Sequence, residues 1–194
     1  MHGLILCGGK SSRMGTDKGL LKLEAKTWAQ TAVDKFSELN FPVKLSVNNE
    51  QYAEYSSVFP IADLIIDDES LSLRGPLLGL LSAHLKNPND SIFLLACDMP
   101  LMEANVLKEL LHHYNENAGG DAFVFTNEGE PEPLCGIYKS AGLSDVLKML
   151  QAGKLSKHSM KFMLEHINTF SFPLREEQKK CFRNFNAHAE LNGL

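Results

Sequence analysis

Two glycines and two cations near the amino terminus form the most suggestive chemical pattern in the chain. Leu4 to Leu6 predict a short buried strand, and the pair Gly8-Gly9 follows it. Arg13 and Lys18 lie in the loop that comes next. Glycines leave main-chain N–H groups open to a ligand and the two side chains supply positive charge, so the pattern is typical of a phosphate-binding loop. A tight turn beside two solvated cations is the alternative interpretation.

This loop matches neither of two well-known phosphate-binding motifs. The dinucleotide fingerprint needs glycines in the pattern G-x-G-x-x-G, which is absent here. The segment Gly9-Lys10-Ser11 looks like the end of a P-loop, but the earlier glycine of that motif is missing. A phosphate bound here would therefore need a different geometry.

A carboxylate follows a second apolar run. Asp98 comes directly after Phe93 to Cys97 and is followed by Met99-Pro100. A carboxylate at the end of a buried strand is costly unless a partner offsets its charge. Magnesium bound to a nucleoside triphosphate is such a partner, because Mg²⁺ takes only one or two protein carboxylates. A role as a cap or turn residue, helped by Pro100, is the alternative.

Two more polar pairs follow predicted strands. Asn48-Asn49 comes after the strand predicted at 43–47, and Asp67-Asp68 comes after the one predicted at 64–66. An asparagine offers donors and an acceptor to a base edge or a ribose. Asp68 has the acceptors for an N–H pair such as the N1–H and N2 amine of guanine, and a ribose or a cofactor is the alternative partner. Both pairs are also common turn formers.

The order of the predicted elements indicates how these residues meet. Strands and helices alternate up to residue 114, which predicts an α/β fold: a three-layer α/β/α sandwich with a mostly parallel, Rossmann-like sheet. Later strands are predicted at 121–126, 134–138, 170–172 and 182–185, and later helices at 140–152, 156–166 and 187–191. Ligands of such sheets lie outside the carboxyl ends of the strands, so the polar residues after each strand are expected at one edge.

The segment from Leu6 to Lys18 resembles a known loop. Its sequence L-C-G-G-K-S-S-R-M-G-T-D-K is similar to the L-A-G-G-x-S-x-R-M-G-x-D-K nucleotide-binding loop of the MobA family, the molybdenum cofactor guanylyltransferases, with Cys7 in place of Ala. The segment C-D-M-P around Asp98 resembles the family's P-C-D-M-P metal motif, with Ala96 replacing the first Pro. The family's N-x-N segment matches Asn184-Phe185-Asn186.

The resemblance implies a nucleotidyltransferase that transfers GMP from GTP to molybdopterin, or to its molybdenum-loaded form, with Mg²⁺ as cofactor and pyrophosphate as the product released. Gly-Gly where related cytidylyltransferases have Ala-Gly favours guanine. The nucleotide-binding residues implied are Leu6, Cys7, Gly8, Gly9, Lys18, Asn48, Asp68 and Asp98. Asp98 is implied as the metal ligand, Asn184 and Asn186 as residues on the pterin side, and Arg13, Lys18 and Asp98 as catalytic residues.

Two of these assignments have competitors next to them. Asn49 competes with Asn48, and Asp67 competes with Asp68. The spacing from Asp68 to Gly75-Pro76-Leu77 is similar to the family's D-x(6)-G-P-L segment and favours Asp68. The basic stretch Lys154, Lys157, His158 and Lys161 would suit an anionic second substrate, or form the solvated face of a helix.

Two other functions are compatible with the sequence. Another nucleotidyltransferase, using CTP or a sugar phosphate, would keep the loop and Asp98 but change the base pocket. A non-catalytic GTP-binding partner of molybdenum enzymes would bind the nucleotide without turnover. Turnover with each of the four nucleoside triphosphates distinguishes the first alternative from a guanylyltransferase. Pyrophosphate release distinguishes an enzyme from the second alternative, a non-catalytic binding partner.

Composition sets outer limits on these readings. With 194 residues the chain is expected to form a single domain, with a nucleotide-binding half at 1–100 and an acceptor-binding half at 101–194. A net charge of −5 argues against nucleic-acid partners, and no apolar run approaches the ~20 residues of a membrane span. The four cysteines are dispersed, which suits free thiols in the cytoplasm. Transient contact with molybdoenzymes or their chaperones is implied by the resemblance.

Overall fold

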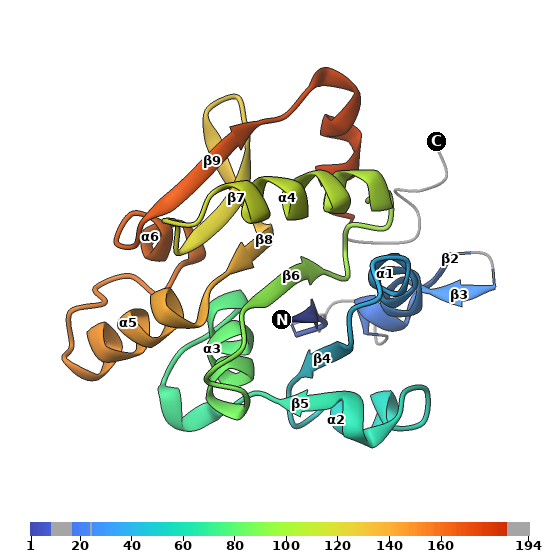
Figure 1. The fold of residues 1–194 in the computed structure, drawn as a ribbon. Helices are drawn as coiled ribbons and strands as arrows, with labels where there is room; N and C mark the ends of the chain where they lie inside the picture. Colours follow the sequence, from blue (N-terminus) through green and yellow to red (C-terminus); the bar gives the residue numbers. More distant parts are fainter. Residues whose placement is uncertain (9–16, 24, 186–194) are drawn as a thin grey trace.

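A seven-stranded sheet forms the centre of the molecule in the computed structural model, which describes residues 1–8, 17–23 and 25–185. The strand order is β5-β4-β1-β6-β8-β7-β9 (Figure 1). The strands are β1 (His2–Leu6), β4 (Val43–Val47), β5 (Leu64–Ile66), β6 (Ile92–Ala96), β7 (Ala122–Asn127), β8 (Glu130–Tyr138) and β9 (Thr169–Pro173). A separate small sheet pairs β2 (Lys22–Leu23) with β3 (Lys26–Thr27).

Strand direction places the loops that matter at one edge. The neighbours β5, β4, β1 and β6 run parallel, whereas β8 pairs antiparallel with both β6 and β7. Strand β9 is again parallel to β7. Because β8 alone is reversed among the strands of this sheet, the segment that enters β8 lies at the same edge as the segments that leave the other six strands.

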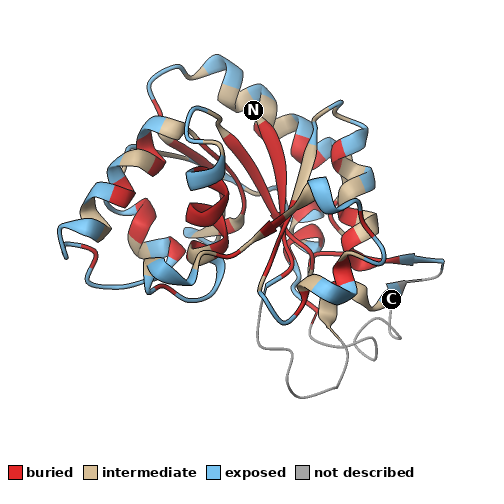
Figure 2. Cartoon of the chain, turned by 90° about the horizontal axis from the view of Figure 1, so that it is seen from below, coloured by how far each residue is buried: buried red, intermediate tan, exposed pale blue. Residues whose placement is uncertain are grey.

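Helices cover both faces of the sheet. One face carries α1 (Trp28–Ser37), α2 (Tyr52–Tyr55) and α4 (Ala104–Glu116), and the other carries α3 (Pro76–Lys86), α5 (Ser140–Gln151) and α6 (Met160–Leu164). The buried strands lie between these two layers (Figure 2). Two separate apolar clusters, one on each side, fill the space between sheet and helices. This arrangement confirms the predicted three-layer α/β sandwich.

Local sequence signals explain where several helices begin. Thr27 accepts a hydrogen bond from the backbone N–H of Gln30 at 3.1 Å, and the Gln30 side chain accepts one from the backbone N–H of Thr27 at 2.9 Å. This reciprocal capping box starts α1. Pro76 occupies the first turn of α3, where its missing N–H costs nothing. Ser159 caps α6 by accepting from the N–H of Phe162.

The carboxyl-terminal part differs most from the prediction. The strand predicted at 182–185 is wrong, because the 3₁₀ helix η4 (Glu176–Phe182) occupies its first residue and irregular chain follows. Phe182 and Phe185 are nevertheless buried, since this segment packs against one face of the sheet rather than adding a strand to its edge. The helix predicted at 156–166 is reduced to α6, and β8 begins earlier than predicted, at Glu130. The helix predicted at 187–191 lies outside the described residues.

The remaining short elements are the 3₁₀ helices η1 (Lys18–Leu20), η2 (Ile61–Asp63) and η3 (Glu69–Leu71). The longest described helix, α4, has 13 residues. Within residues 1–8, 17–23 and 25–185 there is no helix with the length and apolar content to cross a membrane.

Candidate functional site

The loops that leave β1, β4, β5 and β6 meet at one edge of the sheet. Main-chain hydrogen bonds continue between these neighbours just beyond the paired residues: Cys7 N to Ser46 O at 3.0 Å, Asp67 N to Val47 O at 2.9 Å and Cys97 N to Leu6 O at 3.1 Å. These bonds fix the relative positions of Gly8, Asn48, Asp68 and Asp98, each of which follows a bonded residue closely in the chain. Leu6 and Cys7 are themselves buried, so their main chain rather than their side chains borders this edge.

Gly8 lies directly against a buried carboxylate. A Cβ atom at Gly8 would come within 3.3 Å of Asp67 Oδ2. Asp67 is only 9 % exposed, and its Oδ1 accepts a hydrogen bond from Ser46 Oγ at 2.6 Å. Burial raises the pKa of the Asp67 carboxyl from 3.8 to about 6, and the bond from Ser46 opposes this rise. The Asp67 carboxylate therefore lies against the main chain at Gly8.

Asp68 has the opposite environment. Its backbone N–H donates to Ser82 Oγ at 2.8 Å, which fixes its main chain to α3. Its Oδ1 accepts from the N–H of Ser70 at 3.0 Å and so caps η3. Hydrogen bonding with Ser70 holds the pKa of the Asp68 carboxyl below its ordinary value, and the side chain is partly exposed at the edge. Of the two aspartates, Asp68 is thus the more exposed one and its carboxyl has the lower pKa; its predicted role in nucleotide binding stays a prediction.

Asn48 begins a turn into α2. Its Oδ1 accepts from the backbone N–H of Gln51 at 2.9 Å, and its own N–H donates to Gln51 Oε1, also at 2.9 Å. The Asn48 amide Nδ2 has no hydrogen bond to the described residues and remains a donor for a ligand. Asn49 instead donates to Glu69 Oε1 at 3.0 Å. The turn therefore uses the Oδ1 and the backbone N–H of Asn48, whereas the side-chain nitrogen is the atom that remains for a ligand.

Asp98 is the most unusual carboxylate at this edge. Its Oδ1 is buried and has no hydrogen-bond partner among the described residues. Burial raises the pKa of Asp98, and the positive charge of Lys18 opposes this rise. Gly19 packs beside the same strand end, since a Cβ atom there would be 3.3 Å from Cys97 Sγ. The loop that carries Lys18 and the loop that carries Asp98 are therefore neighbours.

The chain after β9 returns to Asp98. We call residues 174–185 the carboxyl-terminal strap. At its end, the N–H of Phe185 donates to the backbone oxygen of Asp98 at 2.9 Å, so the exposed Asn184 lies beside the metal-motif loop. In its middle, Phe182 packs edge-on against Phe125, with 5.7 Å between ring centroids.

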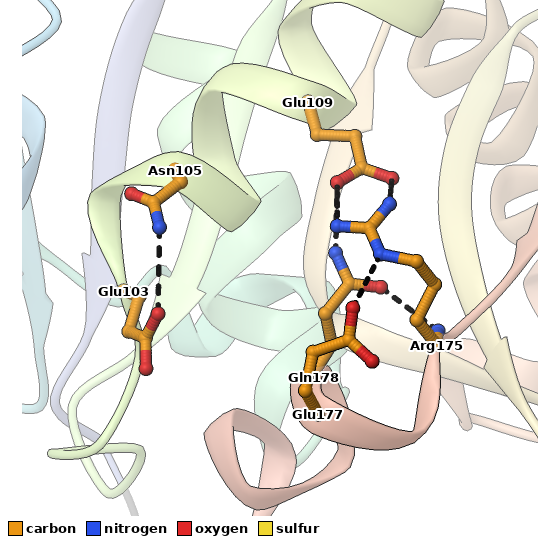
Figure 3. Close-up of polar contacts among 6 residues, drawn as sticks. All are labelled: Glu103, Asn105, Glu109, Arg175, Glu177 and Gln178. Carbon is orange, nitrogen blue, oxygen red and sulfur yellow. Dashed lines mark hydrogen bonds and ion pairs between the residues drawn. The ribbon is translucent and has the colours of Figure 1, made fainter.

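The start of the strap is fastened to α4 by charged groups. The guanidinium of Arg175 donates to both carboxylate oxygens of Glu109, each at 2.8 Å (Figure 3). The amide of Gln178, which is 4 % exposed, adds a further hydrogen bond to Glu109 Oε2 at 2.8 Å. Bidentate pairing of this kind fixes direction as well as distance.

Some predicted site residues are not brought to this edge or are not described. Gly9, Arg13 and Asn186 lie outside the described residues. In the basic stretch, Lys161 pairs with Glu130 at 2.8 Å, whereas Lys154, Lys157 and His158 are exposed. Within the described ranges, no group of three or more His, Cys, Asp or Glu side chains has the arrangement of a metal cluster. A metal here would depend on Asp98 and on ligands from the substrate or water.

Sequence reasoning missed a buried polar network under the Lys18 loop. Asp17 accepts hydrogen bonds from the backbone N–H of Gly19 at 3.0 Å, from the hydroxyl of Tyr55 and from the side-chain amide of Gln51. The one available signal was the spacing Asn48-x-x-Gln51, which is typical of a reciprocal turn but is weak by itself.

Comparison with known proteins gives a consistent result. The MobA-like NTP transferase domain matches residues 3–168. A probable molybdenum cofactor guanylyltransferase from Flavobacterium johnsoniae is 30 % identical over 98 % of this chain and 94 % of its own length. A molybdenum cofactor guanylyltransferase from Campylobacter jejuni is 30 % identical over 96 % of this chain and 91 % of its own. The crystal structure of molybdopterin-guanine dinucleotide biosynthesis protein A from Archaeoglobus fulgidus has a TM-score of 0.78 and 25 % identity, and covers 100 % of this chain and 96 % of that one.

Proposed function

Because the chain belongs to the MobA-like NTP transferase family, we propose that it is a molybdenum cofactor guanylyltransferase. It transfers GMP from GTP to the terminal phosphate of molybdopterin, or of its molybdenum-loaded form, and releases pyrophosphate. Relatives that carry this name match nearly the whole chain at 30 % identity. The observation that carries the proposal is the meeting of Gly8, the segment Lys18-Gly19, Asn48, Asp68 and Asp98 at one edge of the sheet.

The residues at this edge suit a divalent metal, which we assign as Mg²⁺. Asp98 supplies a carboxylate whose buried Oδ1 lacks a partner among the described residues, and an oxygen donor is what Mg²⁺ prefers. Mg²⁺ also keeps several waters and takes the rest of its ligands from phosphates, so a single protein carboxylate is sufficient. When bound, the metal supplies positive charge to the phosphates.

The nucleotide is held by groups of different kinds. Gly8 and Gly9 offer main-chain N–H groups to the triphosphate, and Lys18 offers its ammonium. The amide nitrogen of Asn48, which bonds to none of the described residues, and the carboxylate of Asp68 bind the ribose or the guanine base. The acceptor approaches from the strap, where Asn184 holds the pterin side; Asn186, which lies outside the described residues, is assigned the same role from the family resemblance. Residues 1–100 thus form the nucleotide half and residues 101–194 the acceptor half of one domain.

The reaction is a direct displacement at the α-phosphorus. An oxygen of the acceptor's terminal phosphate forms a new bond to that phosphorus, the bond to the bridging oxygen breaks, and pyrophosphate leaves with the electron pair. The attacking phosphate is already ionised, so the chain need not supply a base. Lys18 and Arg13 stabilise the negative charge that develops, and the converging loops align the two substrates.

The cellular setting follows from the substrates and the thiols. The described cysteines are free and buried, which suits a reducing cytoplasm. The net charge of −5 gives no basis for a nucleic-acid partner. The product is handed on, so transient contact with molybdoenzymes or their chaperones belongs to the proposal.

A nucleotide-selective assay tests the function. Pyrophosphate release is measured with molybdopterin as acceptor, Mg²⁺, and each of GTP, CTP, ATP and UTP in turn. Preference for GTP supports the proposal. Preference for CTP, or pyrophosphate release with a sugar phosphate in place of molybdopterin, would show that the protein is a different nucleotidyltransferase. GTP binding without any pyrophosphate release would identify a non-catalytic binding partner.

Variants then test the residue roles. Asp98→Ala should abolish pyrophosphate release while leaving the fold intact, and Lys18→Ala should weaken GTP binding about tenfold or more. The matched controls are Asp145→Ala and Lys148→Ala, because these two residues form an exposed ion pair on α5. Turnover by Asp98→Ala at the rate of its control would remove the metal role, and unchanged GTP affinity in Lys18→Ala would remove that residue from the site.

A further inference from the structure

Gln51 touches three segments of the proposed nucleotide site. It is 7 % exposed and lies immediately before α2. Its Nε2 donates to the carbonyl oxygen of Cys7 at 2.9 Å and also to the carboxylate of Asp17. Its Oε1 accepts from the backbone N–H of Asn48 at 2.9 Å. One side chain thus connects the glycine turn, the Lys18 loop and the turn that carries Asn48.

The Asp17 carboxylate carries this connection to Lys18. Asp17 immediately precedes Lys18, and its carboxylate also accepts from the N–H of Gly19 and from the Tyr55 hydroxyl. The fit around Gly19 is close, because a Cβ atom there would be only 2.2 Å from Tyr55 Oη. Asp17 is therefore bonded to Tyr55 of α2 and Gly19 packs against the same side chain, so the residues on both sides of Lys18 contact α2.

We propose that Gln51 is a positioning residue that couples the base-binding turn to the triphosphate-binding loop. Gln51 is assigned no contact with GTP; it acts through Asp17, Cys7 and Asn48. The inference rests on the proposed function, since it assumes that Asn48 and Lys18 bind the two ends of one nucleotide.

Physical chemistry indicates why a buried glutamine suits this place. Its side chain donates with its nitrogen and accepts with its oxygen, and the site needs both at once. Without this side chain, the Cys7 carbonyl and the Asn48 N–H lose their hydrogen-bond partner, and the Asp17 carboxylate loses one of its donors. These groups are buried or partly buried. Such unpaired groups are costly, so the two loops would move apart or admit water to recover hydrogen bonds.

The first test compares affinities for GTP and for inorganic tripolyphosphate, with Mg²⁺ present, by calorimetry. Gln51→Met keeps the length of the side chain but loses every one of these bonds. It should weaken the binding of both ligands about tenfold, because the Lys18 loop is no longer held, while the KM for molybdopterin stays within twofold of wild type. Unchanged tripolyphosphate affinity would overturn the proposal.

A double-mutant cycle separates positioning from simple loss of stability. If Gln51 acts on GTP through Asp17, Gln51→Met should have a much smaller effect on GTP affinity in an Asp17→Asn background than in wild type. Independent, additive losses would overturn the coupling. Gln51→Glu is a second variant that keeps the shape and the acceptor but places a second carboxylate against Asp17, and its GTP affinity should fall at least as far.

The chain offers a matched control. Gln178 is also a buried glutamine, with bonds to Glu109 and to the backbone of Arg175, but it lies in the strap. Gln178→Met should lower thermal stability without changing GTP affinity. An equal loss of GTP affinity in both variants would overturn the proposal by showing a general effect of destabilisation. If wild-type protein binds GTP but shows no transfer, the proposed function fails while this inference stands.

Discussion

The buried carboxylate beneath Gly8 should make the stability of this protein fall as the pH rises. Burial raises the pKa of Asp67 from its ordinary value of 3.8 to about 6. Between these two values the folded protein holds a proton that the unfolded chain has released. Because the folded state binds more protons, the free energy of unfolding decreases with increasing pH across this window.

The size of the effect follows from the two pKa values. Each pKa unit corresponds to ~1.4 kcal/mol, so ionising Asp67 in the folded protein costs ~3 kcal/mol above pH 6. Asp67→Asn removes the ionisation and keeps an oxygen that can accept from Ser46 Oγ. The variant should therefore match wild type near pH 4 and exceed its free energy of unfolding by up to ~3 kcal/mol at pH 7.5.

Urea unfolding of both proteins from pH 4 to pH 8 measures this difference. The control is Asp145→Asn, which removes the same charge from an exposed position on α5. A difference between Asp67→Asn and wild type that does not change with pH, or one no larger than that of the control, would refute the reasoning.

The same variant distinguishes the two neighbouring aspartates. Asp67 is buried against Gly8, whereas Asp68 is partly exposed at the edge and hydrogen bonding lowers its pKa. Asp68→Asn should weaken GTP binding about tenfold, and Asp67→Asn should change it by less than twofold. A loss confined to Asp67→Asn would reverse the assignment.

Two further predictions concern Gly19 and the strap. Gly19→Ala should destabilise the protein by ~1–3 kcal/mol, because its Cβ atom would lie 2.2 Å from Tyr55 Oη. In a Tyr55→Phe background the same change should cost much less, and equal costs in both backgrounds, measured by urea unfolding, would contradict this. Glu109→Gln weakens the attachment of the strap to α4 through Arg175, so it should raise the KM for molybdopterin and leave the KM for GTP unchanged. A steady-state assay in which the KM for GTP changes instead would disprove it.

The meeting of these polar residues at one edge of the sheet was predictable, because it depends on chain direction alone. Parallel strands separated by helices must present their carboxyl ends together, so the positions of Asn48, Asp68 and Asp98 follow from three short apolar runs. The side-chain roles needed more information. The Asn48 oxygen accepts from the N–H of Gln51 in the turn before α2, and nothing in the sequence indicates that its amide nitrogen bonds to none of the described residues.

The strap could not be predicted for a different reason. Phe182 and Phe185 are apolar residues in a polar neighbourhood, and such a short pattern suits an edge strand as well as a packed 3₁₀ turn. The structure chooses the turn through contacts with residues that are distant in sequence. Gln178 and Arg175 bond to Glu109, which is more than 60 residues away in the sequence. Local propensity cannot predict a contact over that distance.

The strap also explains how the two halves of the proposed site stay in register. Asn184 is one residue from Phe185, whose N–H is bonded to the main chain of Asp98. The other end of the loop after Asp98 is held as well, since Lys35 of α1 donates to the carbonyl oxygen of Pro100 at 2.7 Å. A carboxylate with a buried, unpartnered oxygen is costly unless a cation pairs with it, which is the role proposed for Mg²⁺. The main chain around it is bonded at Asp98 and at Pro100, and because the first of these bonds comes from the strap, Asn184 stays beside Asp98.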